Sequence, residues 1–93
     1  MIISFKDKEV EKIWDGKVSS KFPFEIQNTT RRKLRMLNNS QDIKDLQTPP
    51  GNRLEKLQGN LKNKNSIRIN DQWRIIFCWD GSNSFEVEIK DYH

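Results

Sequence analysis

The sequence predicts an α+β fold in which two N-terminal helices pack on one face of a small twisted, mainly antiparallel four-stranded sheet. Three observations lead to this expectation. Apolar residues recur at helical spacing before residue 40, whereas after residue 65 they alternate with polar residues as strands require. Between these halves, "QTPPGNR" holds two prolines and a glycine, which interrupt both periods. The 93 residues are enough for one domain, covering positions 1–93.

A short strand and a short helix are expected at the start of the chain. "MIISF", residues 1–5, is an apolar run of strand type. Val10, Ile13 and Trp14 then fall at i, i+3 and i+4, which places one apolar stripe on a helix. Gly16 is expected to end that helix, because glycine is common directly after a helical C-terminus.

A longer amphipathic helix is expected to follow Pro23 and to run to about Asn38. Its apolar face would carry Ile26, Thr30, Leu34 and Leu37. The opposite face would carry three cations, Arg31, Arg32 and Arg35, which in most proteins form an ordinary solvated surface. "SQDIKDL" is expected to add one more turn, capped by Ser40.

Three strands joined by short turns are expected in the second half. "SIRI" alternates Ile67 and Ile69 with Ser66 and Arg68. The core face of "WRIIFCW" would carry Trp73, Ile75, Phe77 and Trp79, and that of "SFEVEIK" would carry Phe85, Val87 and Ile89. "NDQ" and "DGSN" supply the two turns. The second face of the sheet is expected to be open, and a ligand could lie on it.

Composition and charge exclude several classes of protein. A single cysteine rules out an intramolecular disulfide and a cysteine-cluster zinc site. The longest apolar run, residues 75–79, is too short to span a membrane and the N-terminus lacks a secretory signal, so a cytoplasmic protein is expected. Residues 47–74 hold six basic and two acidic side chains, whereas residues 75–93 hold one basic and four acidic side chains. This distribution fits a polyanion-binding site edged by carboxylates and equally fits ordinary surface charge.

Two arginines indicate where an anion could bind. Arg68 and Arg74 each project away from the apolar side of their strand, and the short turn between them would bring both guanidinium groups to one side. Guanidinium groups bind phosphate oxygens in bidentate fashion, so the pair would form a phosphate site. The alternative is that Arg74 pairs with Glu86 or Glu88 on the neighbouring strand. The sequence contains no Gly-rich phosphate loop, metal-ligand cluster or Ser-His-Asp set.

The sequence resembles the HigB toxins of bacterial HigBA toxin–antitoxin pairs, which belong to the RelE/ParE superfamily. The resemblance rests on "MIISF", "PPGNRLEKLQGN", "SIRINDQWRIIFCW" and "VEIKDYH", in this order, and covers essentially the whole chain. It implies a RelE-like fold and cleavage of messenger RNA on the translating ribosome, without a metal or other cofactor. It also implies a helix-turn-helix antitoxin of the HigA type, through which the toxin would reach operator DNA. The helix face with Arg31, Arg32 and Arg35 is a candidate surface for that antitoxin.

The resemblance also implies roles for individual residues. The family's terminal catalytic group falls on Asp91, Tyr92 and His93, and Arg74 matches a position that holds the phosphate. We expect His93 to be the acid, since histidine transfers protons near neutral pH, and Tyr92 to orient the phosphate or stack on a base. Some members carry a histidine where this chain has Glu55, so the base would be Asp91 or Glu55, and Asp91 is expected. The RNA backbone would be bound by Arg68, Arg53, Lys56, Lys62 and Lys64.

Two other functions stay open on the sequence alone. A ParE-like toxin of the same fold would bind gyrase and would lack a nuclease site. A non-catalytic RNA-binding module would need only the basic middle of the chain. The "DYH" ending together with Arg74 favours the nuclease over the gyrase-binding toxin.

Overall fold

The computed structural model describes residues 1–58 and 63–91. Two α-helices, α1 (Lys8–Trp14) and α2 (Phe24–Asn39), are followed by two short 3₁₀ helices, η1 (Ile43–Gln47) and η2 (Pro50–Asn52). The strands come last: β1 (Glu55–Lys56), β2 (Lys64–Arg68), β3 (Trp73–Asp80) and β4 (Asn83–Asp91). They are hydrogen-bonded in sequence order, and every pair is antiparallel. The predicted fold class is confirmed.

Both predicted helices are present, and the local sequence explains their ends. The Asp7 side chain caps α1 by accepting a hydrogen bond of 2.9 Å from the backbone N–H of Glu9. Gly16 lies just after α1 with a φ of +87°, a left-handed conformation that favours glycine. α2 begins directly after Pro23, which has no backbone N–H to leave unsatisfied at a helix start.

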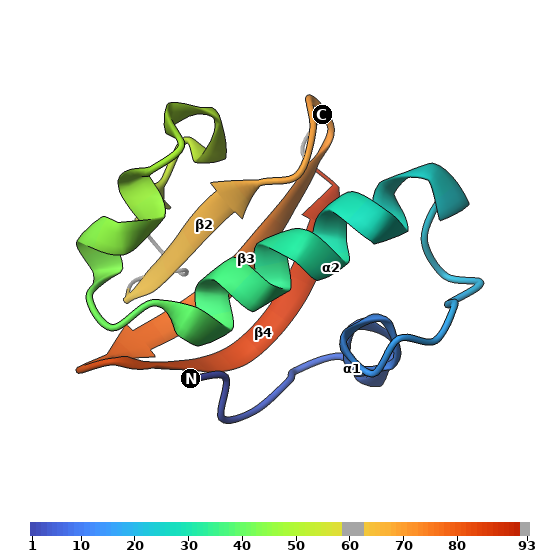
Figure 1. The fold of residues 1–93 in the computed structure, drawn as a ribbon, viewed down its shortest axis with the longest axis horizontal. Coiled ribbons are helices and arrows are strands. Elements are labelled where there is room, and N and C mark those ends of the chain that lie inside the picture. Colours follow the sequence, from blue (N-terminus) through green and yellow to red (C-terminus); the bar gives the residue numbers. More distant parts are fainter. Residues whose placement is uncertain (59–62, 92–93) are drawn as a thin grey trace.

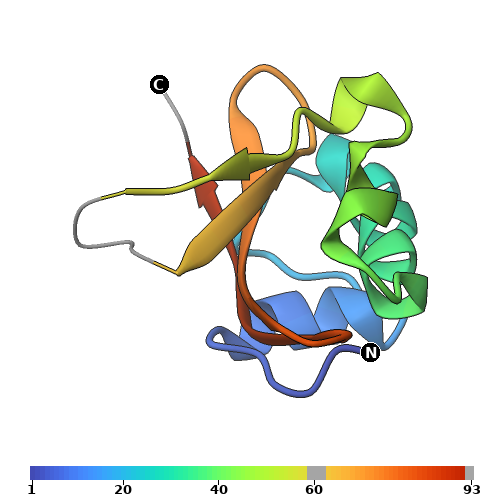
Figure 2. The same cartoon turned by 90° about the vertical axis from the view of Figure 1, so that its left-hand side faces the viewer.

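The core lies between α2 and the sheet, and α1 closes one end of it beside β4 (Figures 1 and 2). The buried side of α2 includes the four predicted residues, Ile26, Thr30, Leu34 and Leu37. The sheet contributes Ile67, Ile75, Phe77, Val87 and Ile89 to the same cluster. No helix in the described part of the chain is both long and apolar enough to cross a membrane.

The fourth strand of the sheet is β1, and not the N-terminal run that was expected to form a strand. Residues 1–5 form only isolated parallel bridges, of Ile2 with Ser84 and of Phe5 with Val87. β1 pairs with β2 instead. A two-residue strand has no alternation to detect, so the sequence pattern cannot reveal it. The difference bears on function because β1 carries Glu55.

The short helix after α2 is capped by Asp42, and the expected cap at Ser40 is wrong. The Asp42 carboxylate accepts a hydrogen bond of 3.0 Å from the N–H of Lys44, and Asp45 accepts one of 3.2 Å from the N–H of Asp42. Ser40 is instead the C-cap of α2, and its hydroxyl donates to the carbonyl of Met36.

A bulge in β4 breaks the strict alternation that the sequence predicts. Glu86 has a φ of +52°, and the register between β3 and β4 shifts just before the pair formed by Cys78 and Phe85. One extra residue turns the side chains before it to the opposite face. The expectation that Phe85 shares the core face with Val87 and Ile89 is therefore wrong, whereas Val87 and Ile89 are in the core.

The second face of the sheet is closed at its centre, where an open surface was expected. Ser66 and Ile76 are cross-strand partners on this face, and both are 0 % exposed. Glu88, the partner of Ile76 on β4, is also buried, and its carboxylate lies 3.5 Å from the amino groups of Lys6 and Lys64. A pocket lies further along this face, where β2 ends and β3 begins.

Candidate anion-binding site

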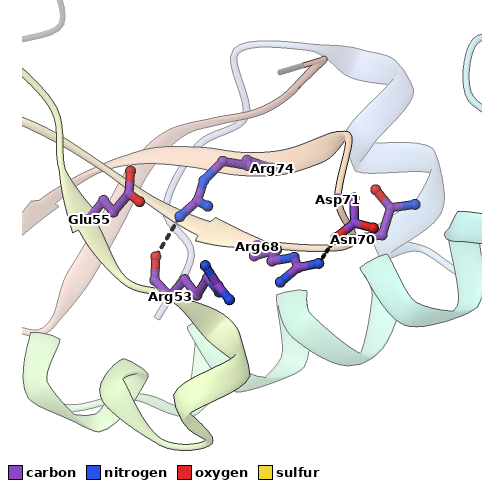
Figure 3. A pocket seen from close by; sticks show the side chains of 6 residues that line it. All are labelled: Arg53, Glu55, Arg68, Asn70, Asp71 and Arg74. Atoms are coloured by element: carbon purple, nitrogen blue, oxygen red, sulfur yellow. Dashed lines mark hydrogen bonds and ion pairs between the residues drawn. The ribbon is translucent and has the colours of Figure 1, made fainter. Parts of the chain in front are cut away.

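A pocket of about 350 Å³ opens where β1, the end of β2 and the start of β3 meet (Figure 3). Its described lining consists of Arg53, Glu55, Arg68, Asn70, Asp71 and Arg74. Three guanidinium groups and two carboxylates therefore face one small volume. Such a concentration of fixed cations favours an anionic ligand, and the carboxylates limit the excess positive charge.

The β2–β3 hairpin brings two of these arginines together, as the sequence predicts. Arg68 and Arg74 are direct partners in the antiparallel ladder, so their side chains leave the same face of the sheet. The turn between them is fixed by Asn70, whose side-chain oxygen accepts hydrogen bonds from the backbone N–H groups of Gln72 and Trp73 at 2.9 and 2.8 Å.

Arg74 is the more firmly held of the two. It is only 8 % exposed, and its Nε donates a hydrogen bond of 2.9 Å to the Ser66 hydroxyl. One terminal nitrogen donates to the backbone carbonyl of Arg53. The alternative partners considered from the sequence have other neighbours: Glu88 pairs with two lysines, and Glu86 contacts Cys78. A buried guanidinium bound to fixed oxygens keeps one orientation, as a charge-stabilising group requires.

Arg68 forms an ion pair with Asp71 in the hairpin turn (Figure 3). The Asp71 side chain is 95 % exposed, so water solvates its carboxylate whether or not the ion pair is formed. Exposed ion pairs contribute little stability. An entering phosphate could therefore replace Asp71 on Arg68 at small cost.

Arg53 reaches the pocket through an unusual backbone conformation. It follows η2 with φ 45° and ψ 56°, a left-handed geometry that costs energy for a residue other than glycine. Its N–H donates to the carbonyl of Pro50 at 3.1 Å. Its side chain lines the pocket while its carbonyl accepts from Arg74, so this single residue contributes to the site twice.

The structure separates the two carboxylates that were candidates for the base. Glu55 lines the arginine pocket and pairs across the strands with Ser66, the residue to which Arg74 is bound. Asp91 pairs with Trp73, on the opposite face from Arg74, and its carboxylate accepts a hydrogen bond of 3.0 Å from Gln72. The geometry therefore brings Glu55 rather than Asp91 to the described wall of the pocket.

Comparison with known proteins identifies the family of the chain. A family description, "RelE-like toxin of type II toxin-antitoxin system HigB", matches residues 3–93. The chain belongs to this family of HigB-like toxins. It is 48 % identical over 80 residues to Toxin HigB-1 of Vibrio cholerae, a match that covers 85 % of this chain and 84 % of the relative. An uncharacterized protein of Haemophilus influenzae is 34 % identical over 79 residues, covering 84 % of this chain and 78 % of that protein.

Solved structures confirm the RelE-like fold expected of such a toxin. YafQ from E. coli superposes with a TM-score of 0.65 at 14 % identity, covering 98 % of this chain and 91 % of the other. The YoeB-YefM complex from Staphylococcus aureus gives a TM-score of 0.61 at 18 % identity, covering 100 % of this chain and 95 % of the matched chain. At these identities the likeness concerns the fold alone.

Two of the lysines expected to bind RNA, Lys56 and Lys64, lie apart from the arginine pocket of this HigB-like toxin. Lys56 lines a second pocket of about 310 Å³, together with Ile43, Asn63, Asn65 and Trp79. Lys64 lies against the Glu88 carboxylate with 14 % of its side chain exposed. The same carboxylate raises the pKa of Lys6 by Coulomb attraction and by a hydrogen bond. Lys62, Tyr92 and His93 lie outside the described residues.

The cationic face expected on α2 contains two surface arginines rather than three. Arg31 turns toward α1, where its Nε donates a hydrogen bond of 2.9 Å to the carbonyl of Ile13. The Ile13 carbonyl also accepts a hydrogen bond from the backbone N–H of Gly16, so Arg31 adds a second bond at the C-terminal end of α1 and ties the two helices together. Arg32 and Arg35 are exposed and remain available to a partner.

Two residues of the pocket were missed from the sequence, Asn70 and Asp71. Both lie in "RINDQ", where the i, i+3 spacing of Arg68 and Asp71 across a turn is the available signal. In residues 1–58 and 63–91, no group of three His, Cys, Asp or Glu side chains could hold a metal ion. The arginine pocket is thus the described feature best suited to an anionic ligand.

Proposed function

We propose that this HigB-like toxin is an endoribonuclease that cuts messenger RNA on the translating ribosome and binds the scissile phosphate in the arginine pocket. The observation that carries the proposal is the convergence of Arg53, Arg68 and Arg74 on one volume that also receives the Glu55 carboxylate. Cations alone would suit any polyanion. A carboxylate beside a phosphate is unfavourable for simple binding, and it is useful where a proton must be removed.

The proposed reaction uses the RNA's own 2′-OH as the nucleophile. Its oxygen attacks the adjacent phosphorus, a P–O bond forms to give a 2′,3′-cyclic phosphate, and the bond to the 5′ oxygen breaks. A base takes the 2′-OH proton and an acid gives a proton to the leaving oxygen. The phosphorane-like transition state carries extra negative charge on its oxygens, which fixed guanidinium groups stabilise.

Glu55 is our choice for the base, because its carboxylate already lies among the arginines. His93 is our choice for the acid and Tyr92 for a group that orients the phosphate, both on the strength of the family's terminal motif. The sequence alone favours Asp91 as base, but Asp91 lies on the face of Trp73 and is bound by Gln72. We assign Asp91 a role in holding the end of β4 rather than in proton transfer.

The proposed partners follow from family membership. Type II toxins act with a cognate antitoxin, and YoeB was solved in complex with YefM. We infer a HigA-type helix-turn-helix antitoxin for this chain, with operator DNA reached only through the complex, and Arg32 and Arg35 as part of the contact surface. A substrate on the ribosome also implies a cytoplasmic location.

Purified translating ribosomes provide the test. After incubation with the protein, the 5′ ends of a defined message are mapped, with and without a chelator such as EDTA at concentrations that leave ribosomes intact. New 5′ ends within the reading frame, produced only when the message is being translated, support the proposal. Intact message together with inhibition of gyrase supercoiling would favour the ParE-like alternative, and binding to RNA without any cleavage would favour a non-catalytic module.

A further inference from the structure

A fully buried amide, that of Asn52, directly precedes Arg53 of the arginine pocket. The Asn52 side chain is 0 % exposed. Its Nδ2 donates hydrogen bonds to the carbonyls of Leu46 at 3.1 Å and Thr48 at 3.4 Å. Its Oδ1 accepts from the amino group of Lys33 on α2. Asn52 thus joins α2, η1 and the proline-containing loop at one point.

Lys33 is an unexpected partner for a neutral amide. The residue is only 6 % exposed, and no ion pair within the described part of the chain involves it. Burial lowers the pKa of Lys33, and the charges of Arg32 and Arg68 lower it further. A buried cation without a carboxylate partner lowers the stability of the fold, so an apolar side chain at this position would give a more stable protein.

The residue after Asn52 connects this buried pair to the site. Arg53 takes its left-handed conformation immediately beyond Asn52, whose own N–H donates to the carbonyl of Pro49 at 2.9 Å. That conformation sends the Arg53 side chain to the pocket and its carbonyl to Arg74. A strained residue keeps its geometry only where its neighbours are fixed.

We propose that Lys33 and Asn52 are positioning residues for the arginine pocket: their buried contact locks η2, which holds Arg53 and, through its carbonyl, the guanidinium of Arg74. The chemistry explains the choice of residues. An aspartate at position 52 could not donate to the carbonyls of Leu46 and Thr48. Its charge would also neutralise Lys33 and weaken the positive potential that attracts a phosphate. The inference rests on the pocket being the phosphate site of the proposed function.

The test measures the pocket without ribosomes. In the full-length protein, the NMR signal of the Arg74 side-chain N–H is followed while inorganic phosphate is added. Asn52→Ala and Lys33→Met should move this signal in the free protein and weaken phosphate binding by roughly tenfold, because the arginines are no longer preorganised. Lys33→Met keeps Asn52 and an unbranched side chain, and it remains informative if Asn52→Ala fails to fold.

Two control variants separate positioning from other effects. Gln27→Ala removes another buried amide, 2 % exposed, which donates to the carbonyls of Ser19 and Phe22 and lies outside the pocket. It should lower Tm but leave the Arg74 signal and phosphate binding unchanged. Arg32→Met removes the exposed charge next to Lys33 and should have a much smaller effect than Lys33→Met.

The outcomes are distinct from those of the nuclease test. Equal losses of phosphate binding in Gln27→Ala and Asn52→Ala would reduce Asn52 to a general stability role and overturn the inference. Equal losses of phosphate binding in Arg32→Met and Lys33→Met would show that Lys33 acts only through its positive charge and does not position Arg53, which also overturns the inference. If the Arg74 signal responds as expected while the wild-type protein cuts no message, the positioning holds and the proposed function fails.

Discussion

Arg68 and Arg74 lie directly opposite each other in β2 and β3, so two side chains of like charge are neighbours on one face of the sheet. Like charges at such positions destabilise a sheet. The cost is offset in part by Asp71 on Arg68, and by the oxygens of Ser66 and Arg53 on Arg74. A pair that costs stability and lines a pocket with cations is consistent with selection for anion binding rather than for folding.

The first prediction concerns Arg74. Arg74→Ala should cost about 3 kcal/mol of transition-state stabilisation, or roughly 10²-fold in rate, because a fixed donor to the developing charge is lost. Arg74→Lys should recover only part of the activity, since an ammonium group cannot bind in fork geometry. Single-turnover cleavage of ribosome-bound message measures both. Arg35→Ala, an exposed arginine on α2, is the control and should keep the wild-type rate. Full activity of Arg74→Lys would reduce Arg74 to a general electrostatic role.

The second prediction decides which carboxylate is the base. Glu55→Gln keeps the shape and removes the basicity, so the cleavage rate should fall by roughly 10²–10⁴ while ribosome binding persists. Asp91→Asn should retain a near-normal rate, because an amide can still accept the hydrogen bond from Gln72. A large loss in Asp91→Asn beside a normal Glu55→Gln would return the role of base to Asp91. In that case removing the Glu55 charge should slightly strengthen RNA binding.

The third prediction concerns the terminal histidine. Deletion of His93 should reduce cleavage by roughly 10²–10⁴, the usual contribution of a positioned acid, and should leave Tm nearly unchanged. Both quantities are measured on the same preparation, so that a loss of folded protein is not mistaken for a loss of catalysis. A truncated protein that cuts ribosome-bound message at the original rate would exclude His93 as the acid.

The helices and the arginine pair could be predicted from the sequence because the apolar pattern of each helix and strand repeats over more than one turn or one pleat. Val10 and Ile13 mark α1, Leu34 and Leu37 mark α2, and all four are fully buried. The pairing of Arg68 with Arg74 follows from alternation on both sides of a short turn.

The remaining features depend on contacts between distant segments. The bulge at Glu86 leaves no trace in a sequence that continues to alternate, so Phe85 was placed on the wrong face. The two-residue strand with Glu55 is defined only by its partner. Lys33 lies in a run of charged residues, a pattern typical of an exposed surface, yet it is buried against Asn52, nineteen positions away. Sequence periodicity does not report which polar residues meet in the interior.

The fourth prediction concerns stability and pH through Asp7. Burial raises the pKa of this carboxyl, but hydrogen bonds from Lys21 and from the Glu9 backbone lower it more, so that it lies below its ordinary 3.8. A carboxyl with a depressed pKa stabilises the fold above its ordinary pKa, and that contribution is lost as the pH falls through the folded-state value. Asp7→Asn keeps the helix cap and loses the ion pair with Lys21.

Urea unfolding at a series of pH values measures this effect. Wild type should be more stable than Asp7→Asn near neutral pH by a few tenths to about 1 kcal/mol, and the difference should vanish in acid. Asp7→Ala should lose about 1 kcal/mol more at every pH, because the cap is lost as well. A difference between wild type and Asp7→Asn that stays constant down to strongly acidic pH would show that the ion pair does not contribute.

The most direct test of the central claim uses a message with a single 2′-deoxynucleotide. The cut site is first mapped on translating ribosomes, and the 2′-OH on the 5′ side of that bond is then replaced by hydrogen. The proposed mechanism predicts that the all-ribose message is cut to a 2′,3′-cyclic phosphate and a 5′-OH, and that the substituted message is not cut at that bond. Cleavage of the substituted message at the same bond would show that the 2′-OH is not the nucleophile, and would contradict the mechanism proposed for the arginine pocket.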